Sequence, residues 1–171
     1  GYIQHINHNI PKTIMSIASL PTNSNILLLA CYDDGLKAYN KTTGKIDDLN
    51  NLLRNASVQY NGRVVSLATY NKQSVLVGTY GSGFYSLNTD FSLATAFISS
   101  SEERDYTRNE PVNNWINSIC PDDSRLWVGT YKGICCFDAE QQRFSVADSS
   151  MQNSIANRIV FDMATDQYNN L

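Results

Sequence analysis

The residues in this sequence that could do chemistry are few, and their spacing does not favour catalysis. His5 and His8 are the two histidines, and a pair three residues apart could contribute to a metal site. No acidic third ligand adjoins them, so we expect a solvated segment without a metal. Adjacent carboxylates occur at 33–34, 47–48 and 122–123, where turn chemistry explains them. We therefore predict no catalytic residues and no enzyme activity in this chain.

The four cysteines do not form a zinc-binding pattern either. Cys31, Cys120, Cys135 and Cys136 lie within apolar runs, and none belongs to a C-x-x-C pair. Successive side chains of a strand point to opposite faces, so Cys135 and Cys136 cannot serve one site together. We expect at least one of them to be a small buried residue, as free cysteine commonly is. No cofactor is predicted for the chain.

The composition excludes several other classes of function. The chain has 13 basic and 16 acidic side chains, a net charge of −3 and no segment rich in lysine or arginine, which disfavours nucleic-acid binding. The longest apolar run, 26–31, is far shorter than the roughly 20 residues of a membrane helix, so we expect no direct membrane contact. With 42% hydrophobic, 11% aromatic and 17% charged residues, an ordered, soluble and β-rich chain is expected.

Three segments of the chain are similar to one another and imply a repeated unit. They cover 13–46, 63–90 and 115–144, and a fourth copy begins at 157. A matching apolar position recurs after 50, 52 and 44 residues, at Ile17, Leu67, Ile119 and Met163. A period of about 45 to 50 residues is typical of the four-stranded blade of a β-propeller.

Each copy reads as four short strands joined by turns. The predicted fold is therefore all-β, a β-propeller fragment of about three and a half four-stranded antiparallel blades. Repeated glycines should supply tight turns or close contacts, and one tryptophan should lie in a blade core. These structural positions are Gly35, Gly78, Gly83, Trp127, Gly129 and Gly133.

The repeats also suggest how the chain is divided. Residues 1–12 are an N-terminal arm or the end of a preceding blade, and blade 1 with an irregular outer connection covers 13–61. Blade 2 covers 62–113, with an insertion near 99–113. Blade 3 follows at 114–156, and 157–171 is the first strand of a truncated blade 4.

The third copy carries a resemblance to a known repeat. It reads Leu-Trp-Val-Gly-Thr-Tyr-Lys-Gly-Ile over 126–134, and 75–84 matches it, whereas 28–31 departs from it. This sequence resembles the two-component regulator propeller repeat of the periplasmic sensor region of Bacteroidetes hybrid two-component system histidine kinases. The resemblance implies a periplasmic, non-enzymatic sensor segment that detects glycan-derived oligosaccharides and signals across the membrane.

In a propeller, the loops between the second and third strands and those leading into the next blade lie on one face. Aromatic rings there could stack on sugar rings, while amide and guanidinium groups bond the hydroxyls. On this basis we predict six ligand-binding residues: Arg63, Tyr80, Asn114, Trp115, Tyr131 and Arg158. A tyrosine repeated in three copies, at 32, 80 and 131, is more simply explained by packing.

Other functions remain open at this stage. The propeller could be structural or hold a protein partner without any small ligand, or it could belong to a lyase or hydrolase whose catalytic residues lie in other blades. One blade cannot cover its own two faces. The remaining blades of a parent chain, or a second copy paired through exposed blade edges, would therefore complete the ring.

Overall fold

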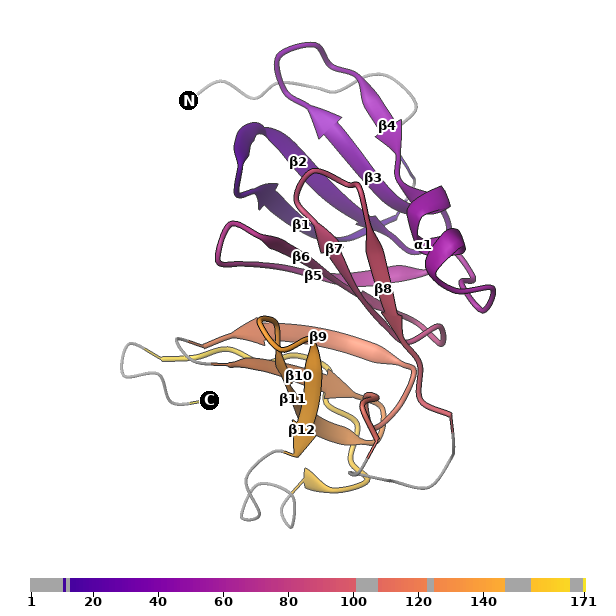
Figure 1. Cartoon of the computed structure of the whole chain (residues 1–171), viewed down its shortest axis with the longest axis vertical. Helices are drawn as coiled ribbons and strands as arrows, with labels where there is room; N and C mark the ends of the chain where they lie inside the picture. The colour runs from indigo at the N-terminus through magenta and orange to yellow at the C-terminus, as the bar shows by residue number, and fades with distance from the viewer. Residues whose placement is uncertain (1–10, 12, 101–107, 123–124, 147–154, 167–170) are drawn as a thin grey trace.

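The chain folds into three four-stranded antiparallel sheets that follow one another along the molecule (Figure 1). This computed structural model describes residues 11, 13–100, 108–122, 125–146, 155–166 and 171. Within each sheet the strands pair in chain order, so that each strand forms a hairpin with the next. The prediction of an all-β chain built from four-stranded antiparallel blades is confirmed.

The strands have the following bounds. Blade 1 contains β1 (Ile14–Leu20), β2 (Asn23–Cys31), β3 (Gly35–Asn40) and β4 (Ile46–Asp48). Blade 2 contains β5 (Val64–Tyr70), β6 (Ser74–Thr79), β7 (Phe84–Asn88) and β8 (Ala94–Phe97). Blade 3 contains β9 (Ile116–Pro121), β10 (Leu126–Thr130), β11 (Gly133–Asp138) and β12 (Arg143–Val146).

The turns within the blades use residues that tolerate the left-handed backbone region. Asn71 and Lys72, between β5 and β6, have φ values of 49° and 55°. Gly83, which precedes β7, has φ 81°, and a Cβ there would lie 2.5 Å from the carbonyl oxygen of Phe97. A side chain at position 83 is therefore excluded by both conformation and space.

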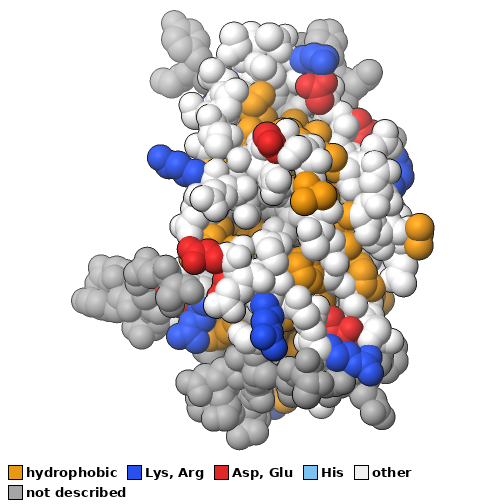
Figure 2. Space-filling view, in the orientation of Figure 1, with side chains coloured by type: hydrophobic (Ala, Val, Ile, Leu, Met, Phe, Trp, Pro, Cys, Tyr) orange, Lys and Arg blue, Asp and Glu red, His pale blue; other side chains and the backbone are white. Residues whose placement is uncertain are grey.

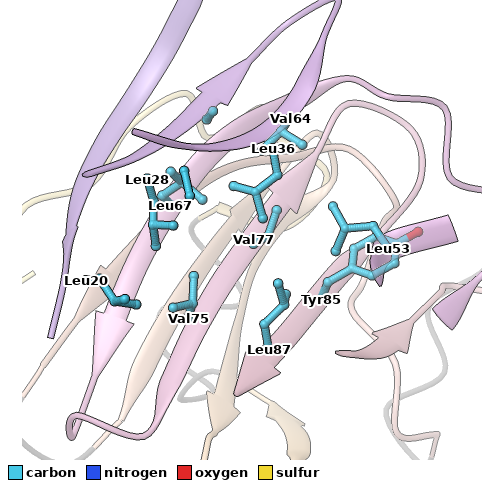
Figure 3. Packing of buried hydrophobic residues seen from close by; sticks show 12 residues of the cluster. Leu20, Leu28, Leu36, Leu53, Val64, Leu67, Val75, Val77, Tyr85 and Leu87 are labelled. Atoms are coloured by element: carbon cyan, nitrogen blue, oxygen red, sulfur yellow. The ribbon is translucent and has the colours of Figure 1, made fainter. Parts of the chain in front are cut away.

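Blades 1 and 2 meet in a mainly aliphatic core that also buries the ring of Tyr85 (Figure 3). Along β6, Val75 and Val77 face this core, whereas Leu76 between them faces blade 3. Strands that are covered on both faces are apolar at successive positions, which explains the unbroken hydrophobic run of β6. Leu53, which is 0% exposed, adds a leucine from the connection after blade 1.

Blades 2 and 3 meet in an aromatic core. Phe84 and Phe97 of blade 2 interleave with Phe137 and Phe144 of blade 3, and the Phe84 and Phe137 ring centroids are 4.7 Å apart. The pairs are tilted or edge-to-face, as aromatic rings prefer. Two aromatic residues from each blade thus fill the space that aliphatic residues fill one blade earlier.

All four cysteines are buried. Cys135 faces the aromatic core, whereas Cys136 lies on the other face of the sheet beside Trp127. Adjacent cysteines on opposite faces of β11 are what strand geometry predicts. Trp127 is 6% exposed, as expected of a core residue, and its Nε1 donates to Asp122 Oδ2 at 3.3 Å.

The blades approach each other closely at a glycine of the second strand. A Cβ on Gly78 would lie 2.9 Å from the carbonyl oxygen of Ile116, the first residue of β9. A Cβ on Gly129 would lie 2.7 Å from Cγ1 of Val160. Val160 therefore has the same position relative to blade 3 as Ile116 has relative to blade 2. Residues 157–166 are thus the counterpart of an inner strand.

The segment after blade 3 occupies that place without forming the predicted strand. The Val160 N–H donates to the Thr130 carbonyl, and Asn117 Nδ2 donates to the Val160 carbonyl, each at 2.9 Å. No strand is assigned over 157–166, and 167–170 lie outside the described residues. The segment is held by separate contacts with blade 3 and lacks the continuous ladder that defines a strand.

The connection after blade 1 is not wholly irregular, contrary to our expectation. It contains a short helix, α1 (Asn50–Ala56), which has no side-chain cap at its start. Leu53 is buried between the blades, and helix α1 contacts β8 of blade 2. Seven residues form a marginal helix alone, so the burial of one apolar face stabilises it here.

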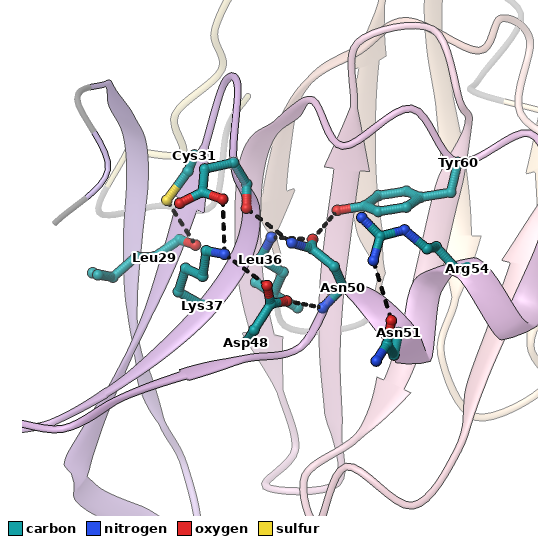
Figure 4. A network of polar contacts seen from close by, with 10 residues as sticks. Leu29, Cys31, Leu36, Lys37, Asp48, Asn50, Asn51, Arg54 and Tyr60 are labelled. Carbon is teal, nitrogen blue, oxygen red and sulfur yellow. Dashed lines mark hydrogen bonds and ion pairs between the residues drawn. The ribbon is translucent and has the colours of Figure 1, made fainter. Parts of the chain in front are cut away.

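A polar network ties α1 to blade 1 (Figure 4). Lys37 Nζ lies 2.9 Å from both Asp34 Oδ1 and Asp48 Oδ2. Asn50 donates its backbone N–H to Asp48 at 2.7 Å and accepts the Leu36 N–H at 3.0 Å. Burial alone would lower the pKa of Lys37, but its hydrogen bonds with Asp34 and Asp48 outweigh this effect and raise it.

Several predicted features lie wholly or partly outside the described residues. The arm that contains His5 and His8 is one, and residues 101–107 of the insertion are another. The described end of that insertion is anchored on blade 3, where Asn109 accepts the Phe144 N–H at 2.7 Å.

Two kinds of structure are absent from the described part of the chain. No helix found there has the length and apolar character needed to cross a membrane. No group of three or more His, Cys, Asp or Glu side chains there is placed to hold a metal ion.

Candidate functional site

One end of the three sheets gathers the loops that the sequence marked as a binding face. Each second strand is followed directly by a tyrosine, and the N–H of that tyrosine donates to the residue that precedes the first strand of the same blade. The donors and acceptors are Tyr32 and Thr13 at 3.1 Å, Tyr80 and Arg63 at 2.9 Å, and Tyr131 and Trp115 at 3.1 Å. The repeat therefore places one loop tyrosine beside one variable residue in every blade.

The rings from neighbouring blades meet in an aromatic platform, which consists of Tyr32, Tyr80, Trp115 and Tyr131. Tyr80 stacks on Trp115, with centroids 4.6 Å apart and planes inclined by 25°. Tyr131 meets the Trp115 ring edge-on at 4.4 Å, and Tyr32 lies 5.8 Å from Tyr80. Trp115 remains 37% exposed, so the platform offers an aromatic surface to solvent.

Arg63 adds a positive charge to the platform. Its guanidinium carbon lies 5.5 Å from the centroid of the Tyr32 ring, a cation–π distance. A hydrogen bond with Tyr131 is the main reason that the pKa of Tyr80 is raised, so the Tyr80 phenol stays neutral at neutral pH. The platform presents hydroxyls, an indole and one guanidinium, which are groups that can stack on a ligand or hydrogen-bond to it.

Asparagines fix the loops that present Arg63 and Trp115. Asn61 Oδ1 accepts the Arg63 N–H, and Asn113 Oδ1 accepts the Trp115 N–H, each at 3.0 Å. This is a local turn in which an asparagine bonds the backbone two residues ahead. The Asn-x-Arg and Asn-x-Trp spacing in the sequence is the cause of these turns.

Asn114 is placed at the platform, but its amide is engaged by the backbone. Oδ1 accepts the Ser99 N–H at 2.6 Å, and Nδ2 donates to the Ser99 carbonyl at 2.9 Å. The Asn114 carbonyl also accepts the N–H groups of Gly81 and Gly83. Through these hydrogen bonds, Asn114 holds the loop before blade 3 against blade 2.

Arg158 is not among the residues that contact the platform rings in the described structure. Since Val160 is the counterpart of Ile116, Arg158 matches Asn114, and Ile159 matches Arg63 and Trp115. Ile159 is 43% exposed at this place. The sequence analysis thus selected Arg158, whereas the repeat position that faces the platform is the next residue, Ile159.

Tyr32 joins the platform although it was not among the six predicted ligand residues. Its signal was present in the sequence, because it follows the second strand as Tyr80 and Tyr131 do. Four residues that were predicted, Arg63, Tyr80, Trp115 and Tyr131, are brought together.

The third blade also matches a known family. Residues 110–132 match the family described as the two component regulator propeller. This part of the chain is therefore similar to one repeat of that family. No curated protein matches the sequence.

Solved structures share the propeller fold. The extracellular domain of the hybrid two component system BT3049 from B. thetaiotaomicron is 18% identical with a TM-score of 0.59, over 77% of this chain and 16% of that chain. The corresponding domain of BT4673 from the same organism is 20% identical with a TM-score of 0.60, over 86% of this chain and 18% of that one. This chain thus spans less than a fifth of either domain.

A designed protein gives a similar match over most of its length. The computationally designed Ika4 protein is 12% identical with a TM-score of 0.61, over 97% of this chain and 89% of that chain. Identities at this level establish the β-propeller fold of the three blades and say nothing about a ligand. The function must therefore be argued from the platform itself.

Proposed function

We propose that this chain is part of the extracytoplasmic sensor region of a hybrid two-component system, and that its aromatic platform binds an oligosaccharide. The observation that carries the proposal is the stacked pair of Tyr80 and Trp115 on the loop face, with Trp115 37% exposed. The regulator propeller repeat in blade 3 and the extracellular domains with the same fold support the sensor part.

The chemistry of the platform suits a sugar. Flat aromatic rings stack on the apolar face of a pyranose, and tyrosine hydroxyls and the Arg63 guanidinium can bond its hydroxyl groups. A polyanion suits this protein less well, because its net charge is −3. On the face of the molecule in Figure 2, basic and acidic side chains are interspersed. Neutral or weakly charged glycans are the ligands that fit best.

The proposed sensor acts by binding and not by catalysis. The oligosaccharide would bind outside the cytoplasm, in the periplasm of a bacterium, and the signal would reach a histidine kinase elsewhere in the protein. A change in the loops that hold Trp115 is a direct way to pass on occupancy, because the Asn114 carbonyl clamps blade 2 to blade 3 beside it.

The test is a titration of oligosaccharides derived from plant and host glycans, by calorimetry, against the chain and against its complete parent protein. Trp115→Ala should weaken binding of the best ligand at least about tenfold, as loss of a stacking ring commonly does. Leu93→Ala removes a side chain that is 59% exposed in another turn and serves as the matched control. No binding to any member of the panel would reject the proposal.

A second candidate function is a protein-interaction propeller. Met15 and Ile17, on β1, are 52% and 59% exposed, which is unusual for an inner strand of a propeller. Further blades of a parent chain, a second copy or a protein partner would cover them. A dimeric mass in solution that Ile17→Glu makes monomeric, without any response to sugars, would favour this function over the first.

A further inference from the structure

The loop that presents Arg63 contains a dipeptide with chemistry of its own. Asn61 is followed by Gly62, and this is the one Asn-Gly pair in the sequence. Asparagine is thermolabile, because the backbone nitrogen of the next residue can attack its side-chain carbonyl carbon and displace ammonia. Glycine favours this reaction, since it has no Cβ to shield its nitrogen or to restrict the backbone. The pair 61–62 is therefore a candidate site of spontaneous modification.

The structure leaves both reacting groups accessible. Asn61 is exposed, and a Cβ built on Gly62 would meet no atom within 4 Å. Gly62 has φ 78°, in the left-handed region. Its N–H has no hydrogen-bond partner among the described residues. The attacking nitrogen is therefore neither packed against a neighbour nor held by an acceptor.

A local turn holds the Asn61 side chain near this nitrogen. Asn61 Oδ1 accepts the Arg63 N–H at 3.0 Å. The ring closed by this hydrogen bond contains both Asn61 Cγ and the Gly62 nitrogen, which keeps the two reacting atoms close together. Asn61 Nδ2 also donates to the Tyr80 carbonyl at 2.8 Å, and both hydrogen bonds lie at the surface. Water readily replaces partners at the surface, so these bonds slow the reaction without preventing it.

We propose that Asn61 is a deamidation site and that its conversion alters the aromatic platform. A base in solution removes the proton from the Gly62 nitrogen, and this nitrogen attacks Asn61 Cγ. A new C–N bond forms, the bond between Cγ and Nδ2 breaks, and Nδ2 takes a proton from solvent and leaves as ammonia. Water then opens the cyclic imide at either carbonyl, which gives aspartate or isoaspartate at position 61. Water is the only other reactant that the conversion needs.

The product differs from asparagine where the platform loops meet. Nδ2, the donor to the Tyr80 carbonyl, is lost, and a carboxylate oxygen that can only accept takes its place, so the two oxygens repel each other. Isoaspartate also adds a carbon to the main chain, which breaks the turn that holds Arg63. Tyr80 stacks on Trp115, so displacement of the Tyr80 loop changes the surroundings of the exposed indole.

Blade 3 supplies a matched control within the same molecule. Asn113 Oδ1 accepts the Trp115 N–H at 3.0 Å, in the same kind of turn as at Asn61. The residue that follows Asn113 is an asparagine and not a glycine. A comparison of Asn61 with Asn113 therefore tests the contribution of Gly62 under identical conditions.

The experiment is incubation of the chain at about 37 °C, at pH 7 and at pH 9, followed by peptide mapping with mass spectrometry. Conversion of Asn61 should be at least about tenfold faster than conversion of Asn113. It should be faster at pH 9 than at pH 7, because a base removes the proton from the attacking nitrogen. Equal rates at the two asparagines, or an Asn61 that stays intact, would overturn the proposal.

A variant isolates the effect of the glycine. Gly62→Asn gives this loop the Asn-Asn sequence of blade 3, and asparagine tolerates the left-handed region. The substitution should slow the conversion of Asn61 at least about tenfold, with circular dichroism confirming the native fold. An unchanged rate in the folded variant would contradict the assignment of Gly62 as the attacking residue.

Tryptophan emission reports the effect on the platform. Aged wild type in which Asn61 is converted should differ in emission from fresh protein, whereas aged Gly62→Asn and aged Trp115→Phe should match their fresh forms. Conversion of Asn61 that leaves the emission unchanged would overturn the effect on the platform. The measurement uses no ligand, so its outcome is separate from that of the oligosaccharide titration.

Discussion

The two interfaces between blades are built from the same repeat but filled differently. Between blades 1 and 2 the core is mostly leucine and valine around the buried ring of Tyr85, and it is closed by Leu53 of α1 and by the Lys37 network. Between blades 2 and 3 four phenylalanines interleave, and no helix from the described connection enters. The repeat therefore determines which positions face a neighbouring blade. The sizes of the side chains at these positions vary, provided that those of the two blades together fill the interface.

The aromatic interface should be the more sensitive to truncation. Phe137→Ala removes a ring that is 0% exposed and in contact with Phe84, Phe97 and Phe144. We expect the free energy of unfolding to fall by about 3–5 kcal/mol, measured by urea denaturation. Phe161→Ala is the control, and its 72% exposed ring should cost less than about 0.5 kcal/mol. A small loss in Phe137→Ala would mean that the aromatic cluster is not a close-packed core.

The aliphatic interface should lose somewhat less from a single truncation. Leu53→Ala should lower the free energy of unfolding by about 2–4 kcal/mol, because it leaves a cavity between α1 and the two blades. Hydrogen exchange should speed up in α1 and β8 and less in β11. Equal acceleration in all three blades would contradict the separation of the two interfaces.

Substitution of the second-strand glycine should lower the stability by a smaller amount, and the loss should differ between the two interfaces. In Gly78→Ala the new Cβ would lie 2.9 Å from the Ile116 carbonyl, which is backbone and cannot rotate away, so we expect a cost of about 1–3 kcal/mol. In Gly129→Ala the three nearest atoms to the new Cβ belong to the side chains of Ser118, Val160 and Met163, so this substitution should cost less. Blade 1 has Ala30 at this position. A larger cost at Gly129 than at Gly78, by thermal unfolding, would overturn this ranking.

The smallest effect is expected from the polar network that blade 1 alone has. Burial raises the pKa of Asp48, but hydrogen bonds from Lys37 and Asn50 outweigh it and the pKa is lowered. A lowered pKa means that the carboxylate stabilises the fold above about pH 4 and loses this effect as the pH falls through the pKa of the folded state. The side chain is 58% exposed, so the effect should stay below about 1 kcal/mol.

Denaturation across pH checks this prediction. Asp48→Asn should be less stable than the wild type at pH 7, and the difference should disappear near pH 2. Asp90→Asn, at the exposed turn between β7 and β8, is the matched control for the pH dependence of a carboxylate whose pKa is also lowered. A difference for Asp48→Asn that persists unchanged at pH 2 would show that packing, and not charge, is responsible.

The blades could be predicted from the sequence because their determinants are local and repeated. Gly83 immediately before β7 and Gly133 at the start of β11 have positive φ, and the apolar run around Val75 matches a strand that is covered on both faces. Helix α1 could not be predicted in the same way. It has seven residues and no side-chain cap, and it depends on burying Leu53 against another blade.

The candidate site was predictable in part for the same reason. Arg63, Tyr80, Trp115 and Tyr131 meet because the repeat brings their loops to one end of the sheets. The Asn114 amide is hydrogen-bonded to Ser99, which lies 15 residues away in the sequence. The spacing of residues alone does not reveal this contact.

The central claim is that Trp115 and Tyr80 form a sugar-binding surface, and tryptophan fluorescence tests it most directly. The chain has two tryptophans, of which Trp127 is 6% exposed and Trp115 37%. Titration with the oligosaccharide panel should give a saturable change in emission in the wild type that is lost in Trp115→Phe. A saturable change that survives in Trp115→Phe, or no change with any oligosaccharide that calorimetry shows to bind, would contradict the claim.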